Sequence, residues 1–204
     1  MNANAIPISL PDLNDPGALE AWFDRRFEQK MAERDASHVP SMTLIATKGT
    51  LDMAYPPFIL ASTASALGWK VSIFFTFYGL NLLKKDLDLK VTPMGNPAMP
   101  LKLPFGPDWL RSQTLHIPTL LMSTPGFQAA ATGLMKKTMR NRGVADIQEL
   151  RDLCVEAEVK LIACQMTVDL FGMDKGDFIP EITDWVGAAS FLPVAQKADV
   201  NLFV

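Results

Sequence analysis

The chain has 204 residues, of which 49% are hydrophobic and 20% charged, and its formal net charge is −3. This length suits one domain with a full hydrophobic core and an extra terminal helix, and the negative charge argues against nucleic acid as a partner, since phosphate binding requires a surplus of basic residues. Its two cysteines exclude a disulfide scaffold and a four-cysteine zinc site, and we expect neither a metal nor a cofactor.

The start of the chain, MNANAIPISLPDLNDPG, has no basic region followed by a long apolar run. We therefore expect no secretory signal peptide and a reducing, cytoplasmic location in which free thiols survive. The most apolar stretch, residues 53–83, is interrupted by two prolines, a glycine and a lysine. It lacks the roughly 18 uninterrupted apolar residues that a membrane span needs. A buried helix and strand are favoured there, with a transmembrane segment as the alternative.

Residues 1–40 are expected to form a polar tail and an amphipathic helix, and residues 41–204 a single α/β domain. In the helix, apolar residues recur at helical spacing between charges, at Leu19, Trp22, Phe23, Phe27 and Met31. This apolar stripe should cover either the domain or a partner subunit.

From residue 41 onward, short apolar runs alternate with segments of helical spacing. The expected strands are 41–48, 70–77, 89–94, 159–164 and 200–204. The expected helices are 51–67, 79–86, 127–142, 146–158, 165–171 and 183–198. This alternation predicts a mainly parallel sheet with helices on both faces, in a flavodoxin-like doubly wound arrangement. Residues 95–125 are rich in proline, and we interpret them as a functional loop or an oligomer arm.

Cys164 is the last residue of an expected strand and directly precedes an expected helix. In open parallel sheets, sites form at the carboxyl ends of the strands. There the sulfur would face free backbone N–H groups and the positive end of a helix dipole, which lower a thiol pKa and stabilise an anionic persulfide or thiosulfonate. From position alone, an inert, buried Cys164 is an equally good interpretation.

The second cysteine, Cys154, lies in the preceding helix on a face that also carries Leu150, Leu153 and Ala157. We interpret it as a structural residue and expect no disulfide between it and Cys164.

Lys48, Gly49 and Thr50 follow the first expected strand and could bind an anionic sulfur substrate through the lysine and the helix N-terminus. We count Gln165, next to the candidate cysteine, with this anion-binding group. A lysine at a strand end is more often simply solvated.

The two histidines, His38 and His116, are not at metal-ligand spacing with a cysteine. A catalytic pair of Cys164 with His116 stays open as a minor alternative. The basic end of the helix near Lys136 and Lys137 could bind an acidic partner or a lipid surface, although most such clusters are a solvated face.

The segment LCVEAEVKLIACQMTVDLFGM, residues 153–173, resembles the signature region of the DsrE/DsrF-like sulfurtransferase family, in which an Ala-Cys-Gln-Met run ends a strand. Residues 44–80 and 186–204 agree with the family as well, so the likeness covers roughly residues 41–204. The resemblance implies a flavodoxin-like α/β fold, a homo-oligomer, and sulfur relay with small carriers resembling TusA and with rhodanese-like proteins as partners. It also implies that the active cysteine is Cys164.

These observations together predict a sulfur-relay protein or sulfurtransferase that binds sulfane sulfur on Cys164, as a persulfide or thiosulfonate, and passes it to a partner thiol. Turnover as an enzyme and stoichiometric carriage are both compatible with the sequence. The alternative hypothesis is a non-catalytic flavodoxin-like assembly or flavin-binding module in which Cys164 is inert. A membrane-surface protein that uses the basic helix is a third, weaker hypothesis.

Overall fold

The computed structural model describes residues 15–92, 107, 109 and 124–204. The chain divides into two compact units, Met1–Val39 and Pro40–Val204, and each is described by itself. Within the described residues, no helix combines the length and the apolar character that crossing a membrane would require.

The first unit contains helix α1 (Pro16–Ser37), which confirms the expected N-terminal helix. Asp15 caps it, because its carboxylate accepts a hydrogen bond of 2.9 Å from the Gly17 N–H, and Pro16 occupies the first helical position. No residue of α1 is buried, and the aromatic side chains of Phe23 and Phe27 are exposed. What covers this apolar stripe stays a prediction.

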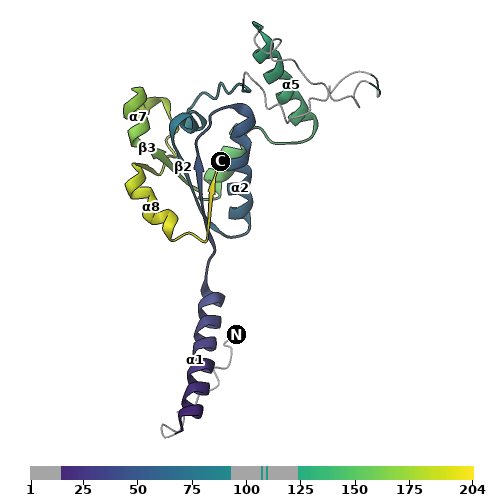
Figure 1. The fold of residues 1–204 in the computed structure, drawn as a ribbon. Helices are drawn as coiled ribbons and strands as arrows, with labels where there is room; N and C mark the ends of the chain where they lie inside the picture. Colours follow the sequence, from purple (N-terminus) through teal and green to yellow (C-terminus); the bar gives the residue numbers. More distant parts are fainter. Residues whose placement is uncertain (1–14, 93–106, 108, 110–123) are drawn as a thin grey trace. The chain divides into compact units, whose positions relative to one another are not determined.

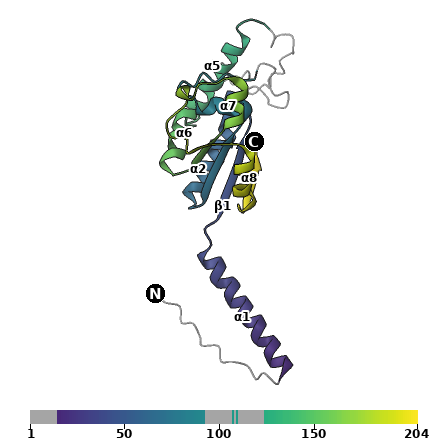
Figure 2. The same cartoon turned by 90° about the vertical axis from the view of Figure 1, so that its left-hand side faces the viewer.

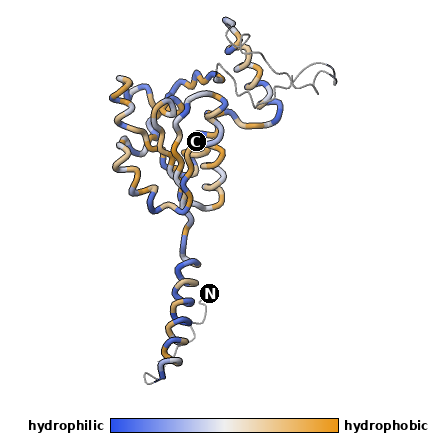
Figure 3. The backbone as a smooth tube through the Cα atoms, viewed as in Figure 1, coloured by the Kyte–Doolittle hydropathy of each residue, from blue (hydrophilic) through white to orange (hydrophobic). Residues whose placement is uncertain are grey.

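The second unit is built on a five-stranded, all-parallel sheet in the order β4-β3-β2-β1-β5 (Figures 1 and 2). The strands are β1 (Ser41–Ala46), β2 (Lys70–Phe75), β3 (Lys160–Cys164), β4 (Asp184–Val186) and β5 (Val200–Phe203). The sheet confirms the predicted flavodoxin-like α/β class, and Figure 3 shows hydrophobic stretches along the strands in the interior.

Helices cover both faces of the sheet (Figures 1 and 2). The helical elements of this unit are α2 (Leu51–Ala66), the 3₁₀ helix η1 (Phe77–Leu83), α5 (Phe127–Asn141), α6 (Ile147–Glu156), α7 (Gln165–Phe171), the 3₁₀ turn η2 (Lys175–Asp177) and α8 (Ala188–Gln196). Helices α2 and α6 pack on one face, α8 packs on the other, and α7 lies next to the edge strand β4. The short helix expected at 79–86 is η1, which begins two residues earlier.

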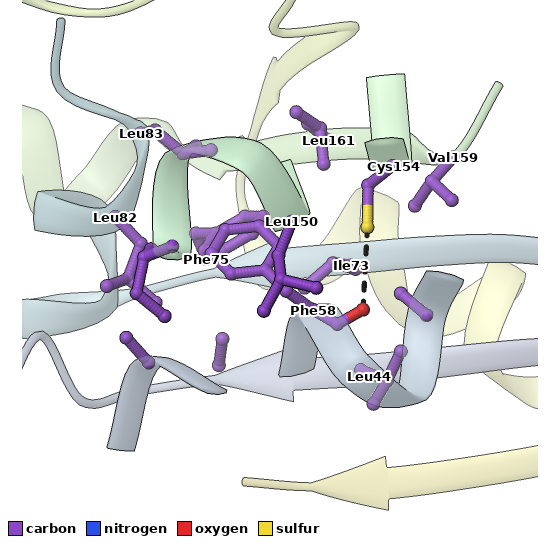
Figure 4. Packing of buried hydrophobic residues seen from close by; sticks show 14 of the residues in the cluster. Leu44, Phe58, Ile73, Phe75, Leu82, Leu83, Leu150, Cys154, Val159 and Leu161 are labelled. Atoms are coloured by element: carbon purple, nitrogen blue, oxygen red, sulfur yellow. Dashed lines mark hydrogen bonds between the residues drawn. The ribbon is translucent and has the colours of Figure 1, made fainter. Parts of the chain in front are cut away.

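The core consists of two clusters, one on each face of the sheet. The larger lies between the strands and α2 and α6, and includes Leu44, Phe58, Ile73, Phe75 and Leu161 (Figure 4). The smaller contains Phe74, Ile162, Cys164 and Phe191, with the rings of Phe74 and Phe191 stacked at 4.5 Å between centroids. Alternate residues of a strand point to opposite faces, so neighbouring residues of β2 and β3 fall into different clusters.

The strand expected at 89–94 is wrong in its described part, since residues 89–92 form no strand. Leu89 is buried, as a strand residue would be. The backbone of Val91, however, forms hydrogen bonds with side chains of α5 and not with a neighbouring strand. Its N–H donates to Thr132 at 3.1 Å, and its carbonyl accepts from the Gln128 amide at 3.0 Å. Residues 93 and 94 lie outside the described residues, as do 95–106, 108 and 110–123 of the proline-rich segment.

The single helix expected at 183–198 is also wrong, because the chain there forms strand β4 and then helix α8. Thr183 begins the change, since it exchanges hydrogen bonds with the Leu161 backbone at 2.8 and 3.0 Å and so draws the next residues onto the edge of the sheet. Gly187 then serves as the N-cap of α8.

Candidate functional site

The candidate site lies where β2 and β3 end side by side. Phe75 and Ala163 are partners in the parallel register of these strands. Thr76, the residue after β2, and Cys164, the last residue of β3, therefore lie at the same carboxyl edge of the sheet. Cys164 is at once the last residue of β3 and the N-cap of α7, as the sequence predicted.

Two threonine hydroxyls meet beside the cysteine. The Oγ1 atoms of Thr76 and Thr167 are 3.2 Å apart, and the Phe77 N–H donates to Thr167 Oγ1 at 3.2 Å. A threonine hydroxyl can accept this N–H and still donate its own proton, either to Thr76 Oγ1 or to the Cys164 sulfur. Thr167 is fully buried, which holds its hydroxyl in place.

The surroundings of Cys164 favour its thiolate. The residue is only 2% exposed, and burial alone would raise the pKa of its thiol. Hydrogen bonds from the hydroxyls of Thr167 and Thr76, and from the backbone N–H groups of Thr167 and Met166, outweigh burial and bring the pKa below its ordinary value. The two N–H groups belong to the first turn of α7, whose N–H groups lack partners within the helix. A thiol with these properties is suited to nucleophilic attack.

The loop after β1 packs tightly against the start of η1. A side chain at Gly49 would overlap the Tyr78 carbonyl oxygen, and one at Gly79 would overlap the carbonyl oxygen of Ala46. The Thr76 N–H also donates to the Ala46 carbonyl at 3.0 Å. Both glycines are thus needed for close backbone approach at this edge, and they fix the segment that carries Thr76.

The predicted anion-binding residues lie at the same edge but are not all together. Lys48 is exposed in the loop after β1, and β2 separates its strand from that of Cys164. Thr50 is the N-cap of α2 and accepts from the Thr92 hydroxyl at 3.4 Å. Gln165 follows the cysteine, and its amide donates to Asp169 at 2.7 Å. Their role in binding an anion stays a prediction.

Cys154 occupies a different environment. It is fully buried in the larger core cluster, where its S–H donates to the Phe58 carbonyl at 3.6 Å (Figure 4). Burial raises the pKa of its thiol to about 12. The α2/α6 face holds Cys154 and the opposite face holds Cys164, so the sheet lies between the two sulfurs and excludes a direct disulfide.

The predictions about the histidines stay untested. His38 is the C-cap of α1, in the first unit, and His116 lies outside the described residues. In the described ranges there is no group of three or more His, Cys, Asp or Glu side chains that could hold a metal ion.

Sequence reasoning did not identify Thr76 and Thr167. Thr167 could have been found as the third residue of the helix that Cys164 caps, a position whose side chain lies near the helix start. Thr76 could have been found only from the pairing of β2 with β3, because it is far from Cys164 in sequence.

The chain is similar in sequence to a family of known proteins. A model of the DsrE/DsrF/DrsH-like family matches residues 38–203. This chain belongs to that family. It is 55% identical to the Sulfur carrier protein DsrE2 of Allochromatium vinosum over 164 residues, which cover 80% of this chain and 97% of that protein. It is also 31% identical to the uncharacterized protein YrkE of Bacillus subtilis over 163 residues, covering 79% and 95%. The family resemblance seen in the sequence is thereby confirmed, and the matched region includes the whole carboxyl edge with Cys164.

Proposed function

We propose that this protein is a sulfur carrier that binds sulfane sulfur covalently on Cys164 and passes it to a partner thiol. The observation that carries the proposal is the thiol itself, which is buried at the carboxyl edge of the sheet and is surrounded by hydroxyl and N–H donors that lower its pKa. The name of the relative from Allochromatium vinosum, Sulfur carrier protein DsrE2, supports the same role.

In the loading step, the Cys164 thiolate attacks the outer sulfur of a donor persulfide, R–S–SH. The new S–S bond forms as the S–S bond of the donor breaks, and the thiolate R–S⁻ leaves, so there is no net oxidation or reduction. A polythionate donor would instead leave a thiosulfonate on the same sulfur, with thiosulfate as the leaving group when the donor is tetrathionate.

In the unloading step, a partner thiolate attacks the outer sulfur of the Cys164 persulfide, and the Cys164 thiolate leaves. The donors around the sulfur act in both steps, because a thiol with a lower pKa is more fully ionised as a nucleophile and also leaves faster. This symmetry suits a carrier, which must accept and release the same atom.

The partners that we propose are a small sulfur carrier resembling TusA and a rhodanese-like protein, together with a second copy of this chain in a homo-oligomer. Lys48, Gly49, Thr50 and Gln165 are proposed to attract an anionic donor to the carboxyl edge. For these residues and partners the support is the family resemblance and the position of the residues around the ends of the strands.

Intact-mass spectrometry tests the proposal. Wild type, Cys164→Ser and Cys154→Ser are incubated with polysulfide, thiosulfate or tetrathionate. Wild type and Cys154→Ser should gain the mass of one or more sulfur atoms, or of a thiosulfonate group, and Cys164→Ser should gain none. An adduct that persists on Cys164→Ser would contradict the role of this residue. The absence of adducts on every variant would favour the flavin-binding or assembly module, for which the absorbance spectrum of the purified protein is the next measurement.

A further inference from the structure

Two exposed aromatic rings stack on each other close to the candidate site. Tyr78 belongs to η1 and Phe171 is the last residue of α7, and their ring centroids are 5.9 Å apart with an angle of 22° between the planes. The side chain of Tyr78 is 64% exposed and that of Phe171 is 42% exposed. A stacked aromatic pair stabilises the contact between the two segments that carry it by more than the area it buries.

The ring pair joins the same two segments as the threonine hydroxyls. Phe171 follows Thr167 by four residues, so both side chains lie on one side of α7. Tyr78 follows Thr76 by two residues in the segment after β2. The two segments are therefore held together twice, by a half-buried contact between hydroxyls and by an outer contact between rings.

The segment between these contacts is strained. Phe77 has a φ of 49°, in the left-handed region that residues other than glycine seldom adopt. Such a conformation persists only where neighbouring contacts impose it. Here the Phe77 N–H is bonded to the Thr167 hydroxyl, and the Gly79 N–H donates to the Thr76 carbonyl at 3.0 Å. If the outer contact were lost, relaxation of Phe77 would withdraw its N–H from Thr167 and free that hydroxyl to turn away from the sulfur.

We propose that Tyr78 and Phe171 are a positioning pair, whose stacking holds residues 76–78 against α7 and keeps the hydroxyls of Thr76 and Thr167 at the Cys164 sulfur. Neither ring has to touch the sulfur, since the pair acts through the two threonines. The inference deepens the proposed carrier function and rests on it, because it names residues that set the reactivity of the same thiol.

The test is the pH dependence of the alkylation of Cys164 by iodoacetamide, followed on the full chain by mass spectrometry of the Cys164 peptide. In Phe171→Ala and in Tyr78→Ala the midpoint of the profile should move to higher pH, and the rate at pH 7 should fall by about threefold. Tyr78→Phe keeps the ring and should keep the wild-type profile. The double alanine variant should match either single variant, because each change alone removes the stack.

Leu170→Ala is the matched control. Leu170 lies in the same helix and is 64% exposed, and its side chain has neither a hydroxyl nor an aromatic ring that could take part in the site. It should leave the profile unchanged. Should an alanine variant be too unstable to measure, Phe171→Leu removes the ring, keeps the apolar bulk and carries the same expectation. Alanine variants that melt earlier but retain the wild-type pH profile would show a merely structural stack and overturn the proposal. A shift of equal size in Leu170→Ala would do the same.

Failure of the carrier function can be told apart from failure of the positioning pair. Sulfur loading of the wild type is measured as a mass increase, independently of the alkylation profile. A wild type that never loads sulfur, with profiles that still shift in the alanine variants, would refute the carrier function and support the pair. A wild type that loads sulfur, with profiles that do not shift, would refute the pair alone.

Discussion

Cys154 and Cys164 pack against opposite faces of the same β-sheet, although they are ten positions apart in the sequence. Their environments act on the two thiols in opposite directions. Burial raises the pKa of Cys154 to about 12, whereas at Cys164 the effect of burial is outweighed by hydrogen bonds that lower the pKa. One fold thus places one thiol where burial raises its pKa and the other where hydrogen bonds lower it.

This difference predicts selective alkylation. In the native protein near pH 8, iodoacetamide should modify Cys164 at least about a hundredfold faster than Cys154, because only the thiolate reacts. Peptide mapping after timed quenching measures both rates in one sample. In strong denaturant the two rates should become similar, which provides the control. Native Cys154 that reacts as fast as Cys164 would contradict the burial argument.

The Thr167 hydroxyl should contribute strongly to the reactivity of Cys164. Thr167→Val keeps the shape of the side chain but removes the donor, and a hydrogen bond to a charged group is worth about 1.5–3 kcal/mol. The alkylation rate of Cys164 at pH 7 should therefore fall roughly tenfold, with a midpoint at higher pH. Thr167→Ser retains a hydroxyl and should stay close to wild type. An unchanged midpoint in Thr167→Val would remove Thr167 from the site.

The general architecture was predictable because its signals are local. Alternating apolar runs and helical segments indicated a parallel sheet, and an apolar run that ends in Cys164 before a helix indicated a thiol at the carboxyl edge. Both depend on residues close together in the chain. The strand and the helix that carry Cys164 accordingly have the expected bounds, except that the strand begins at Lys160.

The errors arose where distant residues decide the structure. Residues 89–92 have the apolar alternation of a strand, but Gln128 and Thr132 of α5 take up the hydrogen bonds of Val91. Residues 184–186 look helical in isolation, but the exposed edge of β3 recruits them as β4. For the same reason the sequence did not reveal Thr76, whose position beside Cys164 follows from the register of β2 and β3.

Cys154 should make stability depend on alkaline pH. The pKa of its thiol rises from the ordinary value of 9.0 to about 12 on folding, so its contribution is complete below pH 9 and is lost as the pH rises toward 12. Within that window the folded state holds one more proton than the unfolded chain, and stability falls by up to about 1.4 kcal/mol per pH unit. Urea unfolding between about pH 9 and pH 10.5 should show wild type losing about 1–2 kcal/mol more than Cys154→Ala.

Cys164 provides the matched comparison, with the opposite sign. Its folded pKa is lowered, so its contribution is present above the unfolded pKa and is lost as the pH falls through the folded pKa. Wild type should therefore gain stability relative to Cys164→Ala as the pH rises toward the pKa of the thiol in the unfolded chain. If both alanine variants followed the same pH dependence, the two cysteines would not differ as the structure requires.

Gly79 should be intolerant of a side chain because of the backbone next to it. A Cβ there would overlap the carbonyl oxygen of Ala46, which belongs to β1 and cannot move aside without disturbing the sheet. We expect Gly79→Ala to lower the free energy of unfolding by about 2–4 kcal/mol, in the range of overpacked sites.

Gly133→Ala in α5 is the control, since a Cβ at that position meets no neighbouring atom. It should stabilise the protein by about 0.5–1 kcal/mol, because alanine favours a helix interior over glycine. Urea unfolding of both variants separates the two effects. Equal stability of Gly79→Ala and wild type would mean that the segment carrying Thr76 does not depend on this close approach. It would contradict the conclusion that Gly79 fixes this segment next to Cys164.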